Sequence, residues 1–88
     1  MITADNIILH ELIGMNTKIV NSTNSQIVGI RGKVIDETKS MFTLDTKNGF
    51  KKIAKKNSDW EFMPDSEKVV VNGSKVNKRP QDRLETKQ

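Results

Sequence analysis

The sequence predicts a small all-β domain: a strongly bent barrel of five to six antiparallel strands with short N- and C-terminal helices. Short segments of alternating apolar and polar residues recur along the chain, and turn signals separate them about every 8–12 residues. One of these segments contains two glycines, Gly29 and Gly32. Glycine inside a strand marks a bulge or a sharp bend, and such bends allow a short sheet to curl into a small barrel.

The first half of the chain is expected to hold a helix followed by two strands. Asp5 or Asn6 is suited to cap the helix, and apolar residues at near-helical spacing lead to Gly14, which ends it. This helix is too short to be stable alone, so its apolar face has to dock on the rest of the domain. The expected segments are a helix within 1–14, a strand at 15–20, a polar loop at 21–25 and a long strand at 28–35.

The second half is expected to hold the remaining strands. Asn48-Gly49 predicts a hairpin, because this pair tolerates the positive φ of a type I′ turn. The alternation breaks in the returning strand, so we expect a bulge or an early strand end near Ala54. The expected segments are a turn at 36–40, a strand through Phe42 and Leu44, a strand at 50–55, a strand with Trp60 and Phe62 on one face, a turn at Pro64, a strand at 69–71 ended by Asn72-Gly73, and a helical segment that starts at Arg79-Pro80.

Length and composition predict a single domain and exclude several kinds of site. The 88 residues divide into the N-terminal helix (1–14), the barrel (15–73) and a basic C-terminal segment (74–88). The absence of cysteine excludes disulfides and thiolate zinc sites, and a single histidine, His10, excludes sites that need several imidazoles. With no signal peptide and no long apolar run, the expected location is the cytoplasm.

Positive charge is concentrated in two separated segments. Residues 47–56 contain five lysines and no acid, whereas residues 1–46 contain four basic and five acidic residues. Residues 75–88 contain five basic and two acidic residues. If folding brings the two basic segments together, they form a patch able to neutralise several phosphates; a solvated surface is the open alternative. The candidate RNA-binding residues are Lys47, Lys51, Lys52, Lys55, Lys56, Lys75, Lys78, Arg79 and Arg83.

Other motifs favour structural explanations. Gly29-Ile30-Arg31-Gly32 matches the G-x-x-G loop of KH modules, but it lies within a run of strand character, so a bend in a strand is favoured. His10-Glu11 lacks a nucleophile or metal to act with, so a structural histidine is favoured over acid–base chemistry. Asp59 and Glu61 share a strand face suited to magnesium, yet solvated charges are the favoured explanation.

The aromatic residues are expected in the core. Alternation places at least three of the four inside, which leaves Phe50, beside the hairpin, as the one realistic candidate for stacking on a base. A surface that is basic without being aromatic suits recognition of folded RNA through phosphates and shape. The four aromatic residues are Phe42, Phe50, Trp60 and Phe62.

With these features placed, the sequence resembles the archaeal ribonuclease P protein component 1 family, which is homologous to a eukaryotic ribonuclease P and MRP subunit. The resemblance covers the chain from about Ile2 to Arg83. The order and spacing of the matching strings make it specific. They are Asp5-Asn6-Ile7-Ile8, His10-Glu11-Leu12-Ile13-Gly14, the run from Val28 to Thr38, Gly73-Ser74, and Arg79-Pro80-Gln81-Asp82-Arg83.

The resemblance implies a bent Sm-like β-barrel and a role in the ribonucleoprotein that cuts the 5′ leader from precursor tRNA. In that family the RNA subunit is the catalyst and uses Mg²⁺. The residues of this chain independently predict that it has no catalytic residue and binds no metal or other cofactor of its own. The family also implies a zinc-containing protein partner, contacted through the N-terminal helix and an adjacent barrel surface. Carried over to this sequence, the partner contacts are Ile7, Ile8, Leu12 and Ile13.

Within this expectation the cations act as fixed counterions that stabilise the catalytic RNA and support substrate binding. Arg79 and Arg83 are suited to bidentate phosphate contacts, although pairing with Asp82 or Glu85 is equally open. The alternative function is a free-standing Sm- or OB-like module that binds single-stranded RNA. A self-contained nuclease is disfavoured because the chain offers no credible catalytic triad or metal cage.

Overall fold

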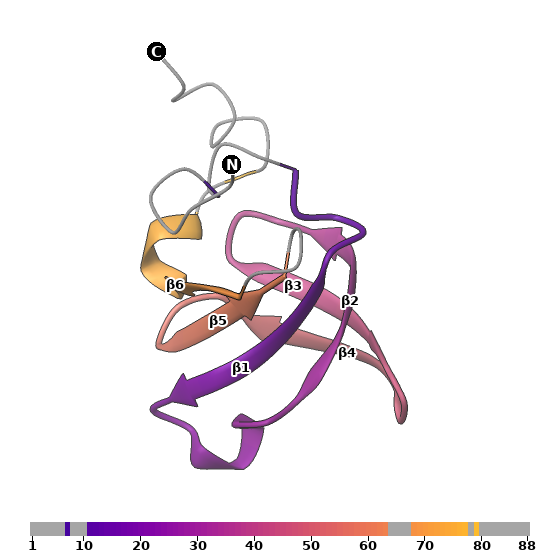
Figure 1. The fold of residues 1–88 in the computed structure, drawn as a ribbon, viewed down its shortest axis with the longest axis horizontal. Coiled ribbons are helices and arrows are strands. Elements are labelled where there is room, and N and C mark those ends of the chain that lie inside the picture. The colour runs from indigo at the N-terminus through magenta and orange to yellow at the C-terminus, as the bar shows by residue number, and fades with distance from the viewer. Residues whose placement is uncertain (1–6, 8–10, 64–67, 78, 80–88) are drawn as a thin grey trace.

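The structure, a computed structural model, describes residue 7, residues 11–63, residues 68–77 and residue 79. Six strands form one antiparallel sheet in the order β4-β3-β2-β1-β5-β6 (Figure 1). The predicted all-β class is therefore confirmed. The described elements are β1 (Asn16–Ser22), η2 (Ser25–Ile27), β2 (Arg31–Glu37), β3 (Met41–Thr46), β4 (Gly49–Ala54), β5 (Ser58–Phe62), β6 (Val69–Asn72) and η3 (Gly73–Val76), of which η2 and η3 are 3-10 helices.

The sheet is strongly curved. Strand β1 pairs with β2 on one side and with β5 on the other (Figure 1). The register shifts between Ile19 and Asn21 where β1 meets β5, and between Val34 and Asp36 where β2 meets β3. Bulges of this kind bend a strand and increase its twist. Within the described residues the edge strands β4 and β6 do not pair with each other, so hydrogen bonds do not close the barrel.

Inward-facing side chains from the strands form one core. Trp60 and Phe42 are fully buried and meet edge to face, with ring centroids 5.0 Å apart. Phe62 meets Phe42 in the same way at 6.1 Å. Such pairs contribute about 0.5–1.5 kcal/mol beyond the area they bury. The prediction that at least three of the four aromatic residues lie in the core is confirmed.

The strand predicted at 28–35 begins later than expected. Strand β2 starts at Arg31, and the preceding residues form a turn in which Gly29 adopts a φ of +95°. The amide of Gly29 donates to the Ile19 carbonyl at 2.8 Å, which holds the turn against β1. Gly32 does lie within β2, where a Cβ atom would collide with the carbonyl of Asp45. The G-x-x-G string is therefore a turn leading into a close strand contact, and the expected bend is displaced toward Gly29.

The β3–β4 hairpin forms where Asn48-Gly49 predicts it, but with a different turn. Thr46 pairs with Gly49, and the Thr46 hydroxyl donates to the Gly49 carbonyl at 2.6 Å while accepting from the Asn48 amide at 3.2 Å. Gly49 adopts a φ of +103°, whereas Asn48 is not among the described residues with positive φ. The type I′ expectation is therefore wrong, because the left-handed residue follows the turn, where glycine adopts it without strain.

The two chain ends contribute to the same core. Ile7 and Leu12 near the N-terminus and Val76 in η3 are fully buried with the strand residues. Of the predicted N-terminal helix the structure describes Ile7 and residues 11–14, and residues 11–14 are not helical but end in a turn at Ile13-Gly14, so this part of the prediction is wrong. The turn at Pro64 and the helical segment from Pro80 onward lie outside the described residues. None of the helices in the described part of the chain is long and apolar enough to cross a membrane.

Candidate nucleic-acid interface

Three lysines lie on the β3–β4 hairpin. Lys47 is in the turn, Lys51 pairs across the ladder with Leu44, and Lys52 pairs with Thr43. Because successive residues of a strand point to opposite faces, Lys51 and Lys52 project on opposite sides of β4. All three lysines are exposed, so their ammonium groups are available to an anionic ligand.

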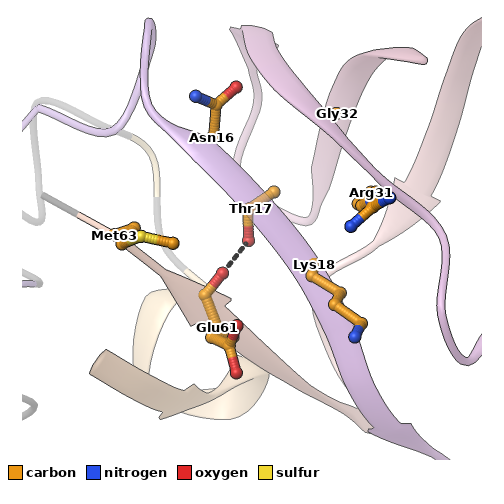
Figure 2. Close-up of a pocket in the computed structure, with 7 residues that line it drawn as sticks. All are labelled: Asn16, Thr17, Lys18, Arg31, Gly32, Glu61 and Met63. Atoms are coloured by element: carbon orange, nitrogen blue, oxygen red, sulfur yellow. Dashed lines mark hydrogen bonds between the residues drawn. The ribbon is translucent and has the colours of Figure 1, made fainter. Parts of the chain in front are cut away.

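A second group of cations lies on β1 and β2, where the sequence analysis nominated no binding residue. Lys18 lies directly opposite Arg31, and Lys33 follows on the same face of β2; all three are exposed. Figure 2 shows Lys18 and Arg31 on neighbouring strands, with Glu61 on the other side of Lys18. Like charges placed directly opposite each other destabilise a sheet. An anion bound between Lys18 and Arg31 would relieve this repulsion.

Arg31 connects the two groups. It borders a depression of about 490 Å³ between the turn before β2 and the β3–β4 hairpin, together with Lys47, Lys51 and one acid, Asp45. It also borders the depression of about 250 Å³ beside Lys18 that Figure 2 shows. None of these four cations forms an ion pair with a carboxylate in the part of the chain that the structure describes. We call the surface formed by these two depressions, which Lys18, Arg31, Lys47 and Lys51 border, the basic face. The strand register places Lys51 on the core-facing side of the sheet and Lys18 and Arg31 on the other side, so this surface curves around the end of the sheet at the hairpin.

Lys55 is not part of this surface, and the prediction that it contacts RNA is wrong. Strand β4 ends at Ala54 as expected, but Lys55 continues the inward-facing positions of β4 and is fully buried. Its Nζ donates to Glu37 Oε2 at 2.7 Å and to the Val76 carbonyl at 2.9 Å, and it lies 4.8 Å from the centroid of the Phe42 ring. A buried ammonium group requires such partners, because an isolated charge in the interior is very costly.

The other predicted RNA-binding residues lie away from the hairpin turn. Lys56 follows the end of β4, and Lys75 lies in η3; both are exposed. The bond from Lys55 to the Val76 carbonyl places η3 beside the end of β4, far from the hairpin turn at the opposite end of that strand (Figure 1). The described residues of the two basic segments therefore meet only where Lys55 bonds Val76, and the hairpin lysines lie away from the described residues of the second segment. The remaining candidates are Arg79, which is exposed, and Lys78 and Arg83, which lie outside the described residues.

The predicted protein-partner residues divide into core and surface. Ile7 and Leu12 are fully buried in the barrel core, so their assignment as partner contacts is wrong. Ile13 is 41% exposed and remains available to a partner. Ile8 lies outside the described residues. The sequence pattern showed that one face of this segment is apolar, but only the packing shows which residues that face contains.

The motifs considered for catalysis have structural roles where the structure describes them. Asp59 accepts hydrogen bonds from the side-chain amides of Asn72 at 3.1 Å and Asn21 at 3.5 Å, and so links β1, β5 and β6. Among the described residues no group of three or more histidine, cysteine, aspartate and glutamate side chains is placed to hold a metal ion. His10 lies outside the described residues.

These features define a class of protein: a small, bent, antiparallel β domain in which four of the described cations border a basic face across β1, β2 and the β3–β4 hairpin. The family model described as ribonuclease P/MRP, subunit p29, matches residues 5–86 of the chain. The chain belongs to this family of ribonuclease P protein subunits, and the resemblance found in its sequence motifs is confirmed.

Curated relatives and a solved structure agree with this assignment. Ribonuclease P protein component 1 of Nitrosopumilus maritimus is 58% identical over 84 residues, which cover 96% of each chain. The protein of the same name from Methanosphaera stadtmanae is 39% identical over 88 residues, covering 99% of this chain and 95% of the relative. A solved structure described as a homologue of the human ribonuclease P protein Rpp29 is similar at a TM-score of 0.59 and 33% identity, covering 84% of this chain and 97% of that one.

Proposed function

We propose that the chain binds and stabilises the catalytic RNA of ribonuclease P, which removes the 5′ leader from precursor tRNA, and supports substrate binding. The observation that carries the proposal is the basic face, because its four exposed cations border two depressions that share Arg31, and none of them forms an ion pair among the described residues. Phosphates are the anions that such a surface fits. Each phosphate contact releases condensed counterions, which makes binding both favourable and strongly dependent on salt.

In this proposal the polypeptide supplies fixed positive charge and the RNA subunit supplies the chemistry with its own Mg²⁺. Cations placed between RNA helices reduce the repulsion between their phosphates, so the active RNA fold forms at a lower magnesium concentration. Arg31 is suited to the centre of the interface, because its guanidinium can hold a phosphate through two parallel hydrogen bonds. Lys18, Lys47 and Lys51 act as point charges around Arg31.

A protein partner would use a different surface. The amide of Gly14 donates to the Val34 carbonyl at 2.7 Å, which holds the chain next to Ile13 beside β2. Ile13 and Ile35 are 41% and 38% exposed, and together they offer apolar area for the zinc-containing ribonuclease P subunit. This pair replaces the buried Ile7 and Leu12 in the proposed contact. As a part of ribonuclease P the chain would act in the cytoplasm.

The second candidate function is a free-standing module that binds single-stranded RNA. One observation favours it: Phe50 is exposed next to the hairpin lysines, as in proteins that stack unpaired bases on an aromatic ring. The two functions differ in the RNA they prefer. A ribonuclease P subunit prefers the folded ribonuclease P RNA, whereas a single-strand module binds an unstructured RNA of equal length as tightly.

The test is a comparison of these two RNAs over a series of salt concentrations, with affinity measured by fluorescence anisotropy. We expect the folded RNA to bind on the order of 10-fold tighter or more. For four phosphate contacts the plot of log K against log salt should have a slope of about −3 to −4. Equal affinity for both RNAs would favour the single-strand module, and a flat salt dependence would contradict binding through the basic face.

A further inference from the structure

Phe50 is the one aromatic side chain that the core does not use. It is 72% exposed, while no other large apolar side chain in the described residues exceeds 47%. Phe42, Trp60 and Phe62 are all fully buried. Burial of a phenylalanine side chain is normally favourable by about 1.5–3 kcal/mol. A domain this small buries little surface, so it needs its large apolar side chains in the core. The exposure of Phe50 therefore points to a role at the surface.

The neighbours of Phe50 are charged. Strand β4 is an edge of the sheet, so none of the strands that the structure describes pairs with β4 on the side away from β3. On its inner side Phe50 pairs with Asp45, and Asp45 pairs in turn with Lys33. Lys52, two residues along β4, projects from the same face as Phe50. The ring thus lies among cations that outnumber the single acid, and not within an apolar patch.

These surroundings favour a ligand that is both flat and anionic. A protein that docked on Phe50 through the hydrophobic effect would require further apolar side chains around the ring, as interface cores have. An unpaired nucleotide offers a base that stacks on an aromatic ring and phosphates that pair with lysines, and this combination is how proteins bind single-stranded RNA. Folded RNAs present such nucleotides in loops and bulges.

We propose that Phe50 stacks on an unpaired base of the bound RNA, with Lys33 and Lys52 holding the adjacent phosphates. The proposal rests on the RNA-binding function proposed above and deepens it. The basic face provides affinity for phosphates of any sequence, while Phe50 adds a contact that only an unstacked base can make. A perfectly paired RNA helix cannot make this contact, because its bases are stacked on each other.

The test uses two variants and two RNA probes of equal charge. Phe50→Leu removes the ring but keeps an apolar side chain, and Phe50→Tyr keeps a ring; neither should affect folding at so exposed a position. Val70→Ala, at another exposed apolar position on β6, is the control. The probes are a single-stranded oligoadenylate of about 12 nucleotides, within the range of known site sizes, and the same oligomer with abasic residues.

We expect Phe50→Leu to weaken binding of the oligoadenylate on the order of 10-fold, while Phe50→Tyr and Val70→Ala stay within about 2-fold of the unmodified protein. The abasic oligomer should bind all four proteins equally, with the same dependence on salt.

Unmodified protein that binds both oligomers equally would overturn the stacking proposal alone. If the abasic oligomer showed no salt-dependent binding, the proposed RNA-binding function itself would fail. Phe50→Leu that kept its RNA affinity but lost association with the other ribonuclease P proteins would show that Phe50 contacts protein.

Discussion

Replacing Lys55 with methionine is expected to destabilise the domain by about 3–5 kcal/mol, which is a large part of the roughly 5–15 kcal/mol that stabilises a typical domain. Lys55 is fully buried, and its Nζ bridges Glu37 and the Val76 carbonyl. The substitution removes the ammonium group and leaves the buried carboxylate of Glu37 without it. It also removes one contact between η3 and the barrel, so the free energy of unfolding in urea should fall sharply.

Two further variants show whether the loss has this cause. Lys56→Met changes the exposed neighbour of Lys55 and should alter the free energy of unfolding by no more than about 0.5 kcal/mol. The double variant Lys55→Met/Glu37→Leu removes both buried charges, so it should recover much of the stability lost in the single variant. If Lys55→Met and Lys56→Met had the same small effect, the buried ion pair would be contradicted.

Neutralising part of the basic face is expected to weaken binding of ribonuclease P RNA by on the order of 100-fold or more at about 0.1 M salt. The variant is Arg31→Gln/Lys47→Gln/Lys51→Gln, whose three positions border one depression. Each lost phosphate contact lowers the steepness of the salt dependence by about 0.7–0.9, so the slope should become shallower by about 2–3. Lys55 is left unchanged, because its loss would confuse weaker binding with unfolding.

The matched control removes the same amount of charge elsewhere. Lys39→Gln/Lys56→Gln/Lys75→Gln changes three exposed lysines that do not border the basic face, and urea unfolding should show both triple variants to be folded. We expect the control to change RNA affinity and its salt dependence only slightly. If the control weakened RNA binding more than the Arg31 variant, the RNA interface would lie at the end of the domain that carries η3.

Local patterns predicted much of the fold. The alternation of Phe42 with Leu44 and of Trp60 with Phe62 identified two strands and their inward faces, because side chains on a strand alternate with a period of two. Asn48-Gly49 identified the hairpin. The turn type was not predictable from the sequence, because Asn48 and Gly49 can both adopt a positive φ. Only the pairing of Thr46 with Gly49 decides which of the two does so.

The proposed RNA-binding surface was predicted less well, because it depends on contacts between residues that are distant in the sequence. Lys18 and Arg31 are thirteen positions apart and lie in a segment with more acids than bases, so only the pairing of β1 with β2 brings them together. The sequence did indicate that Lys55 points inward, because Lys55 lies two residues after Ile53 and side chains two residues apart on a strand share a face. A buried lysine requires a carboxylate partner, and the sequence alone does not show that Glu37 lies opposite the end of β4.

Cleavage of precursor tRNA by reconstituted ribonuclease P at limiting Mg²⁺ tests most directly whether the basic face is where this chain acts on the RNA. The reaction contains the RNA subunit and the other protein subunits, with either the unmodified chain, the Arg31→Gln/Lys47→Gln/Lys51→Gln variant or the Lys39→Gln/Lys56→Gln/Lys75→Gln control. We expect the unmodified chain and the control to lower the Mg²⁺ concentration needed for cleavage, and the Arg31 variant to require more Mg²⁺. Cleavage with the Arg31 variant at the same Mg²⁺ concentration as with the unmodified chain would contradict the account.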